Sequence, residues 1–444
     1  MVDDIDVTYQ DLANGQAIQL VGLAAGCIFF IPFTKKYGRR STYIVSTIAM
    51  AGSSWWNAYT QNRVSIYLSN MLFGLAGATN ATAVQMSIRD MFFVHQRGTA
   101  NSIYFAGALA GTFLMPMAAG AQAVESGWRS SYLTLAAILT GLSVVLIFVF
   151  EETKFVPEAT PETDAISIHE AYAEEGMDSK SSIASASLSQ PRRSTFRAYL
   201  HSMRFLTPTN ESIPQATYAP ALTAGLPHAM FSSLQLASGI CWLVVLSSMT
   251  SVIFSAPPYN FDPAAVGYMF GGPCVGTVFG TLYGGYFADN MIVWLARRNG
   301  GVFEAEMRLY LYPLPAVFGA AGLIMFGATA DRGMHWIYPS IGGALFAFSL
   351  AAVSDIAFTL VLDAYPNLVA QTFVIVAFFQ NGVSIAGPFT ITPWMDSMGI
   401  TNMFITAGCL SLLINMLAIP LVIWGRKARV GLMPWYTKLS KRFA

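Results

Sequence analysis

The chain of 444 residues is 54% hydrophobic and only 11% charged, with a mean hydropathy of +0.50. These values exclude an ordinary soluble domain, because so much apolar surface needs lipid to cover it. Lys plus Arg and Asp plus Glu number 24 each, so the net charge of zero gives no indication of a nucleic-acid partner.

Eleven apolar windows follow one another along the chain, each near the ~20 residues that span a ~30 Å hydrocarbon core as a helix. Backbone groups in lipid must be satisfied within the segment, and no window alternates as a strand does, so all are predicted to be helices. The fold class is therefore an all-α membrane protein. The windows are 15–34, 42–60, 64–88, 100–122, 130–150, 223–256, 263–288, 309–330, 337–361, 367–391 and 401–424.

Positive charges gather in alternate loops. Of the 24 Lys and Arg, only Arg63, Arg129 and Arg332 fall on one side, and the other 21 (24 − 3) fall on the opposite side. Because cytoplasmic loops collect Lys and Arg, the side with 21 is predicted to face the cytosol. Eleven spans then place the N-terminus outside and the basic tail, 427–444, in the cytosol.

One polar segment, 151–222, divides the chain and is rich in Ser, Thr, Glu and Pro. We predict a partly disordered cytosolic linker between an N-terminal helical bundle, 1–150, and a C-terminal six-helix bundle, 223–426. Near the end of the linker, apolar residues recur on one helical face over 194–207. This stretch is either a helix on the inner leaflet or plain linker.

The two halves share two sequence patterns, as expected of a duplicated transporter. IPFTKKYGRR at 31–40 and GGYFADNMIVWLARRNGG at 284–301 each place a glycine and paired basic residues at a cytosolic exit. AGTF at 110–113 and AGPF at 386–389 are each followed within a few residues by proline. Glycine there permits close helix approach, and proline permits a kink.

On these residues the sequence resembles the major facilitator superfamily, in particular its fungal branch of twelve-span drug:proton antiporters, along nearly the whole chain. The resemblance implies two pseudo-symmetric helical bundles and a cytosolic gate motif, G-x-L-a-D-R-x-G-R-[RK], that locks them together. Lys35 stands where the family has its Asp, so the first copy is incomplete. The matching gate residues are Gly38, Arg39 and Arg40 in the first half and Gly285, Asp289, Arg297 and Arg298 in the second. The family's glycine and proline motif of helix five is matched by Gly107, Gly111, Pro116 and Gly120.

Two departures from the family bear on mechanism. The fourth-helix motif R-x-x-x-G appears as Asn70 to Gly74, so the arginine linked to proton coupling is absent. Family members also have a helix before the first window, so the windows correspond to family helices two to twelve. Either the coding sequence was taken from an internal methionine, which we favour, or this variant has lost a cavity-lining helix and does not transport.

The sequence shows no nucleophile and base pair, no metal-ligand cluster and no phosphate loop, so we expect no enzyme, no cofactor and no metal. The four cysteines lie inside apolar windows and are assigned to packing. An ionisable residue in a span is a functional candidate. Asp355 lies ~12 Å from the cytosolic end of its window and is the candidate for proton coupling, the alternative being a hydrogen bond to Ser354 or to a facing helix.

Polar groups at mid-span are candidates for lining a substrate cavity. For any one of them the alternative role is a hydrogen bond between helices. The candidates are Asn80, Gln85, Tyr104, Gln235, Tyr268, Gln380 and Asn381.

Together these features predict a monomeric secondary transporter that moves a small organic solute, such as a drug, toxin or metabolite, against protons by alternating access. Its partners are the solute, protons and the lipid bilayer. Export and the plasma membrane follow from the resemblance, with the vacuole or another internal membrane as alternatives. The alternative function is a non-transporting membrane sensor or scaffold, or an inactive truncated transporter.

Overall fold

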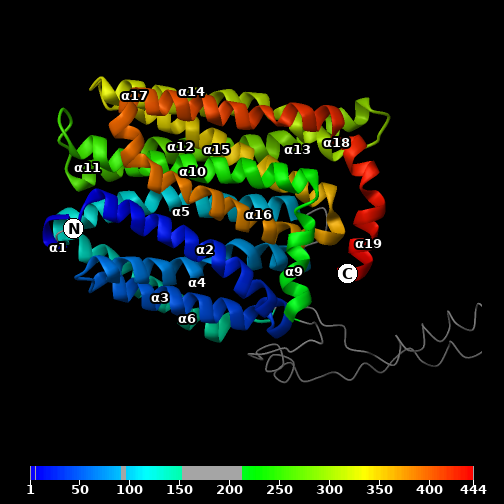
Figure 1. Ribbon diagram of the computed structural model, residues 1–444, viewed down its shortest axis with the longest axis horizontal. Coiled ribbons are helices and arrows are strands. Elements are labelled where there is room, and N and C mark those ends of the chain that lie inside the picture. The colour runs from blue at the N-terminus through cyan, green and yellow to red at the C-terminus, as the bar shows by residue number, and fades with distance from the viewer. Residues whose placement is uncertain (1, 6, 92–96, 153–212, 444) are drawn as a thin grey trace, which may run out of the picture.

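The computed structural model describes residues 2–5, 7–91, 97–152 and 213–443. Every regular element in these ranges is a helix, and Figure 1 shows the long ones running side by side. The all-α prediction is thus confirmed. The possible helix at 194–207 lies outside the described residues.

The N-terminal half contains five long helices at the positions of the first five windows. A capping box starts the first of them: the Asp11 amide donates to Thr8 Oγ1 at 3.2 Å, and the Thr8 amide donates to the Asp11 carboxylate at 2.9 Å. Gly38, at φ 105°, then turns the chain sharply into the next helix. The helices are α1 (Val2–Ile5), α2 (Tyr9–Tyr37), α3 (Arg39–Ala58), α4 (Arg63–Met91), α5 (Arg97–Ser126) and α6 (Trp128–Val149).

The C-terminal half is preceded by a short helix that the sequence analysis assigned to the linker. This helix, α9 (Ile213–Thr223), has 11 residues and an internal Pro220, so it carries no transmembrane signal. The elements that follow are α10 (Pro227–Ser255), α11 (Pro263–Tyr268), α12 (Gly271–Leu282), η1 (Tyr283–Phe287), α13 (Ala288–Arg298), η2 (Ala305–Leu311), α14 (Pro313–Asp331), α15 (Ile337–Ala364), η3 (Pro366–Leu368), α16 (Val369–Ser384), α17 (Ala386–Met416), α18 (Ala418–Gly431) and α19 (Met433–Phe443).

Eight stretches of the described residues are long and apolar enough to cross a membrane by length and composition. One of them, Gln371–Gly431, has 61 residues, which is about 90 Å of helix against a ~30 Å core. Gly399, at φ 74° and ψ 168°, breaks this stretch, so we interpret it as two passes. α3 and α4 have 20 and 29 residues but are more polar than the eight stretches. Eleven passes therefore remain a prediction.

The two halves repeat the same helix packing. α2 packs on α4 as α12 packs on α15, and α3 packs on α4 and α6 as α14 packs on α15 and α17. This correspondence is what a duplication predicts. The halves meet along two seams, where α2 contacts α16 and α17, and where α5 contacts α11 and α12.

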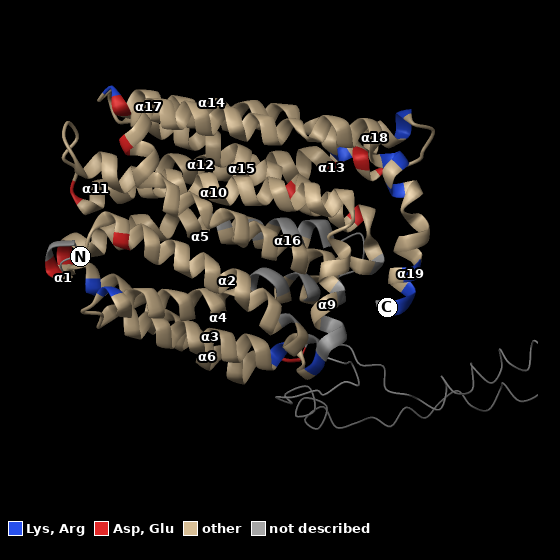
Figure 2. Cartoon of the chain, in the orientation of Figure 1, with Lys and Arg blue, Asp and Glu red and all other residues tan. Residues whose placement is uncertain are grey.

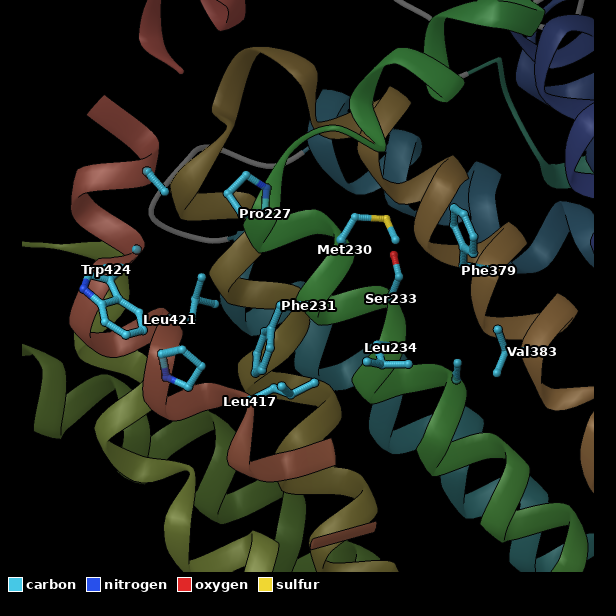
Figure 3. A pocket seen from close by; sticks show the side chains of 14 residues that line it. Pro227, Met230, Phe231, Ser233, Leu234, Phe379, Val383, Leu417, Leu421 and Trp424 are labelled. Atoms are coloured by element: carbon cyan, nitrogen blue, oxygen red, sulfur yellow. The ribbon is translucent and has the colours of Figure 1, made fainter. Parts of the chain in front are cut away.

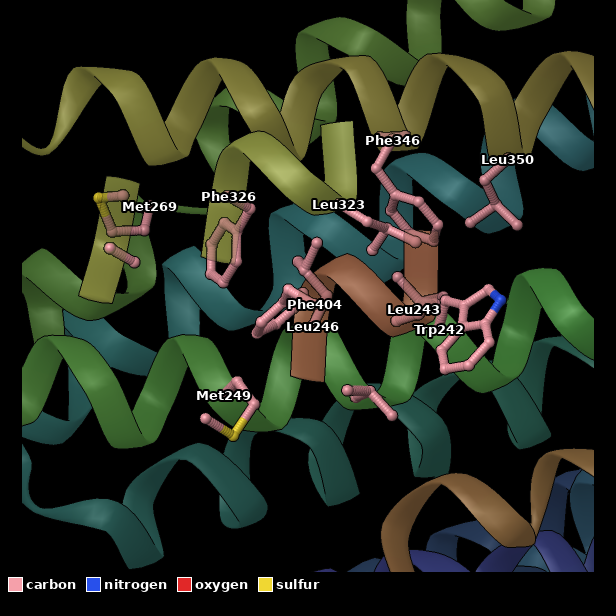
Figure 4. Packing of buried hydrophobic residues seen from close by; sticks show 14 of the residues in the cluster. Trp242, Leu243, Leu246, Met249, Met269, Leu323, Phe326, Phe346, Leu350 and Phe404 are labelled. Carbon is pink, nitrogen blue, oxygen red and sulfur yellow. The ribbon is translucent and has the colours of Figure 1, made fainter. Parts of the chain in front are cut away.

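Burial differs strongly between the halves. A cluster around Trp242, Phe326 and Phe404 forms the centre of the C-terminal half, as Figure 4 shows. In the most apolar part of α15, 83% of the residues are buried, whereas the values are 6% for α5 and 11% for α6. The N-terminal half therefore leaves apolar helix surface uncovered within the described chain.

Charged residues gather at the two ends of the bundle, as Figure 2 shows. The end at which α18 and α19 lie is called the basic end, because α13, α18 and α19 carry Arg297, Arg298 and the basic residues from Arg426 onward. The opposite end, at which α1 lies, is called the acidic end, because α1 and the first turn of α2 carry Asp4 and Asp11. The apolar length of the helices lies between these ends, as expected of a protein that spans a bilayer.

Candidate functional site

A cavity of about 640 Å³ lies between the two halves, toward the acidic end. Its walls are formed by the first turns of α2, the second half of α10, Pro116, Phe270 just before α12, and part of α17. Half of the lining residues carry an amide or a hydroxyl and the other half are apolar, which suits an organic solute with both kinds of surface. These polar groups belong to Thr8, Tyr9, Gln10, Gln16, Ser247, Ser248, Ser251 and Thr392.

Two hydrogen bonds in the cavity wall join the halves. Ser248 Oγ of α10 donates to Gln16 Oε1 of α2 at 3.1 Å, and Thr392 Oγ1 of α17 donates to Gln10 Oε1. Gln10 Nε2 also donates to Asn14 Oδ1 at 3.0 Å, which orients the amide. A neutral hydrogen bond contributes only about 1 kcal/mol net, so these contacts can open at modest cost.

The sequence analysis missed Gln10 and Gln16, because it considered polar groups at mid-span and these lie near the start of a window. The sequence did contain a signal that these residues line a cavity, because two amide side chains lie six residues apart in an otherwise apolar helix. Ser247 and Ser251 carry a second signal, since residues four apart share a helix face. Of the predicted cavity residues whose side chains are described, none lines this cavity.

The structure places those predicted residues elsewhere. Gln235 is 2% exposed, and its Nε2 donates to the Ile414 carbonyl at 2.7 Å, the helix-to-helix role considered as its alternative. Asn381 is buried and donates to the Ala377 carbonyl of its own helix at 2.8 Å. Tyr268 is 59% exposed on α11. Tyr104 and Gln380 are half-buried, and the side chains of Asn80 and Gln85 lie outside the described part.

Asp355 lies two-thirds of the way along α15 and is 2% exposed. Neither of its carboxyl oxygens has a hydrogen-bond partner among the described residues, so the alternative bond to Ser354 is not formed there. Gly284 of the π-helical turn η1 packs directly on it, since a Cβ at that glycine would lie 2.8 Å from Asp355 Cβ. A buried carboxylate without a partner is costly, so this conformation suits the neutral acid.

In the first half, the gate residues are joined to the end of α6. Glu152 accepts the amides of Arg39 at 3.0 Å and Arg40 at 3.3 Å, so a carboxylate sits at the N-terminus of α3, where the helix dipole favours negative charge. Arg40 Nη2 donates to the Ile147 carbonyl at 2.6 Å. The sequence analysis missed Glu152, which stands 112 residues away in the chain from Arg40.

In the second half, Asp289 is the one predicted gate residue with an ion pair among the described residues. Arg308 donates to Asp289 at 3.1 Å and to Asp363 at 2.6 Å, so this charge network joins α13 to α15. Gly285 lies in η1, while Arg297 and Arg298 are exposed at the end of α13, where Arg298 stacks 3.8 Å from the Trp294 ring centroid. These bonds, like those of Glu152, connect helices within one half, whereas the resemblance implied a lock between halves.

A buried cluster lies beside this network at the basic end. Glu306 accepts from Arg429 Nη2 at 3.1 Å and lies 3.2 Å from His228 Nε2, while His228 Nδ1 lies 3.1 Å from the Tyr365 hydroxyl. Burial alone would raise the pKa of Glu306, but the hydrogen bond with His228 and the charge of Arg429 outweigh it and hold the pKa below its usual value. The cluster therefore holds a carboxylate that joins η2 to α10 and α18.

The glycine and proline motif of α5 divides into two parts. Gly120 packs on the Pro263 carbonyl of α11, and a Cβ at Gly267 would lie 2.8 Å from the Pro116 carbonyl oxygen. These two contacts form the seam between α5 and α11. Gly107 and Gly111 have no neighbour within 4 Å of such a Cβ among the described residues.

Comparison with known proteins agrees with this architecture. The chain is 29% identical to an uncharacterized MFS-type transporter of Schizosaccharomyces pombe, over 99% of this chain and 81% of that protein. It is 26% identical to protein HOL1 of Saccharomyces cerevisiae, covering 97% and 82%, and 23% identical to the probable drug/proton antiporter YHK8 of the same yeast, covering 95% and 76%.

The fold matches that of solved transporters. The proton:xylose symporter XylE aligns with a TM-score of 0.63 at 12% identity, over 95% of this chain and 90% of that one, which shows the fold alone. A sequence profile described as the Major Facilitator Superfamily matches residues 1–388. The chain therefore belongs to the Major Facilitator Superfamily and is a multi-pass membrane transporter of that fold.

Proposed function

We propose that the chain carries a small organic solute across the membrane by alternating access, with the 640 Å³ cavity as the binding site. The observation that carries this proposal is the position of the cavity between two halves that repeat the same packing. Because the bonds of Gln10 and Gln16 cross between the halves, rocking the halves apart at the acidic end breaks them and opens the cavity there.

The proposed cycle exports the solute in exchange for protons. The excess of Lys and Arg at the basic end supports a cytosolic position for that end. The name of one relative, a probable drug/proton antiporter, supports exchange of the solute against protons. Export and the plasma membrane are parts of the proposal itself. Asp355 is the proposed proton carrier, because it is buried without a partner beside a π-helical turn, a feature common at functional sites.

Flux into energised inside-out vesicles, measured with an unbiased panel of metabolites and drugs, tests the proposal. The wild type is expected to concentrate at least one solute when a proton gradient is imposed. Asp355→Asn is expected to abolish the dependence on the gradient, and Ser354→Ala serves as the neighbouring control. Unchanged activity and unchanged pH dependence in Asp355→Asn would show that protons do not move through this residue.

We further propose that one more transmembrane helix packs on α5 and α6, in the place that α10 occupies in the other half. α10 packs on α15, α16 and α17, whereas no described helix takes the equivalent position. A Cβ at Gly387 would lie 3.2 Å from the Cys241 carbonyl oxygen of α10. Gly111, its counterpart in the repeated pattern, faces open space among the described residues, which supports a site for a helix there.

The open face of α5 and α6 also favours the second candidate, a sensor or scaffold that does not transport. The flux experiment separates the two when this chain is compared with a version that carries the first helix of a family member at its N-terminus. Transport by either version supports the transporter. No change in any solute with either version supports the sensor or scaffold.

A further inference from the structure

An apolar groove of about 420 Å³ lies between α10, α16 and α18, away from the cavity between the halves. It shares no residue with that cavity. Figure 3 shows side chains converging on it from the three helices and from Leu417, which directly precedes α18: Met230, Phe231 and Leu234 from α10, Phe379 and Val383 from α16, and Leu421 and Trp424 from α18.

The chemistry of the groove suits a hydrocarbon chain. Ser233 is the one residue with a polar side chain besides Trp424 among its described lining, and its hydroxyl donates to the Ala229 carbonyl of its own helix at 2.7 Å. A polar solute would find few hydrogen-bond partners there. Val383 and Trp424 are exposed on membrane-spanning helices, so the groove is an apolar depression in the surface that meets lipid.

The basic end of the groove carries unpaired positive charge. Residues 425–444 contain Arg426, Lys427, Arg429, Lys438, Lys441 and Arg442 and no acidic residue. Arg426 and Arg429 pair with Glu304 and Glu306, at 2.8 Å and 3.1 Å. Within the described chain, no acidic side chain pairs with Lys427, Lys438 or Lys441, and all three are exposed.

Two features place Lys427 and the first turn of α19 near the groove. Lys427 follows Trp424 by three residues, so it lies on the same side of α18 and one turn closer to the basic end. α19 crosses the basic end from α18 toward α9, as Figure 1 shows, and a Cβ at Gly225, just before α10, would lie 2.9 Å from the Trp435 ring. Arg442 fixes the far end of α19 by donating to the Tyr218 hydroxyl at 2.8 Å.

We propose that the groove binds an acyl chain of an anionic phospholipid, whose headgroup is held by Lys427 with the exposed lysines of α19. Basic residues beside a membrane span attract anionic headgroups, and the indole of Trp424 suits the boundary between acyl chain and headgroup. The bound lipid contacts α10, α16 and α18 together, and it therefore stabilises the C-terminal half.

The test uses the full chain purified in detergent, titrated with phosphatidylserine or with phosphatidylcholine of the same acyl chains. Melting temperature and lipid retained in native mass spectrometry are the two readouts. Phosphatidylserine is expected to raise Tm and to remain bound at one copy per chain. Lys427→Ala is expected to weaken its apparent affinity about fivefold, and Val383→Trp, which fills the groove, is expected to remove the effect.

Two matched variants test whether removing any positive charge, or adding an indole ring anywhere on the surface, has the same effect. Arg332→Ala removes a positive charge at the acidic end, and Val278→Trp adds the same ring on the exposed face of α12. Both are expected to respond to phosphatidylserine as the wild type does. If Val383→Trp does not fold, Met230→Trp fills the same groove from α10.

Three results would overturn the proposal. Equal increases in Tm with phosphatidylcholine and with phosphatidylserine would show that the anionic headgroup does not contribute to binding. A phosphatidylserine shift that survives both groove-filling variants would place the lipid elsewhere. A dimer that forms without retained lipid and is lost in Val383→Trp would identify the occupant as a second copy.

Discussion

At the basic end, three elements meet at the carboxylate of Glu306. It contacts His228 of α10 and Arg429 of α18, and the pKa of Glu306 lies below its usual value. A carboxyl with a lowered pKa in the folded state stabilises the protein at pH values above its ordinary pKa. That contribution is lost as the pH falls from the ordinary pKa through the lowered one.

Glu306→Gln is therefore expected to lower Tm at neutral pH and to flatten the loss of stability in acid. A hydrogen bond to a charged group contributes about 2 kcal/mol, which sets the expected effect at pH 7. Thermal unfolding in detergent from about pH 3 to pH 7 measures it. Glu304→Gln is the control, because its partner Arg426 is 68% exposed and a surface pair contributes little. If Glu306→Gln and the wild type lost the same stability between pH 7 and pH 3, the lowered pKa assigned to Glu306 would be contradicted.

The surroundings of a single residue could be predicted only where an ionisable side chain falls inside an apolar window. The burial of Asp355 agrees with its place inside an apolar window, where a carboxyl is rare, and its role in proton coupling stays a prediction. Gln235 was a cavity candidate and forms the helix-to-helix bond that was its alternative role, because a sequence does not show which face of a helix a neighbour covers. Glu152 is at the edge of the linker, and its role depends on the turn at Gly38, far away in the chain.

At the scale of elements, the seam between α5 and α11 depends on two glycines. Gly267 approaches the Pro116 carbonyl, and Gly120 approaches Pro263. Gly267→Leu is expected to destabilise the protein by about 1–3 kcal/mol, because overpacking forces the helices apart. Gly107→Leu, on the open part of α5, is expected to change stability by no more than about 0.5 kcal/mol.

Melting temperatures of the two variants in detergent measure this difference. The same pair also tests the extra helix proposed on α5 and α6. If that helix binds over Gly107, then Gly107→Leu becomes destabilising in the extended chain while it stays neutral in this one. Equal destabilisation by both variants in the present chain would contradict the packing described for α5.

Helix positions followed from the sequence because hydropathy reports the length of a span directly. The spans differ from the windows mainly at their ends: the window 263–288 corresponds to helices from Pro263 to Arg298. The additional residues form α13, which is amphipathic and ends in Arg297 and Arg298, so a hydropathy window does not register it. α9 was missed because 11 residues with an internal proline resemble linker.

At the scale of the whole molecule, alternating access requires the halves to separate near Gln16 and Ser248. In a background without the native cysteines, Gln16→Cys with Ser248→Cys is expected to be bridged by a bifunctional thiol cross-linker with a cleavable disulfide, and the bridge is expected to stop transport. Reduction is expected to restore it. The control is Trp56→Cys with Ser65→Cys, which replaces a side-chain contact of 2.7 Å within one half and is expected to leave transport unchanged when bridged by the same reagent. Continued flux with the first bridge formed would contradict motion at this contact.

The duplication was predictable as a pattern but its asymmetry was not. AGTF and AGPF match as sequences, yet Gly387 contacts α10 while Gly111 faces open space in the described chain. Sequence similarity between repeats reports common descent of the helices, and it does not report whether each helix has its neighbour. The solute is likewise not encoded in the motifs, because the lining of the cavity varies independently of the frame that surrounds it.

Because α15 is far more buried than α5 and α6, these helices are expected to differ in the free energy that local opening costs. Local opening costs least where few apolar contacts hold a helix. Backbone amides of α5 and α6 are therefore expected to exchange with deuterium through small fluctuations, and those of α15 only when the entire domain comes apart. The C-terminal bundle is thus expected to stay rigid, while α5 and α6 are expected to move more easily relative to it.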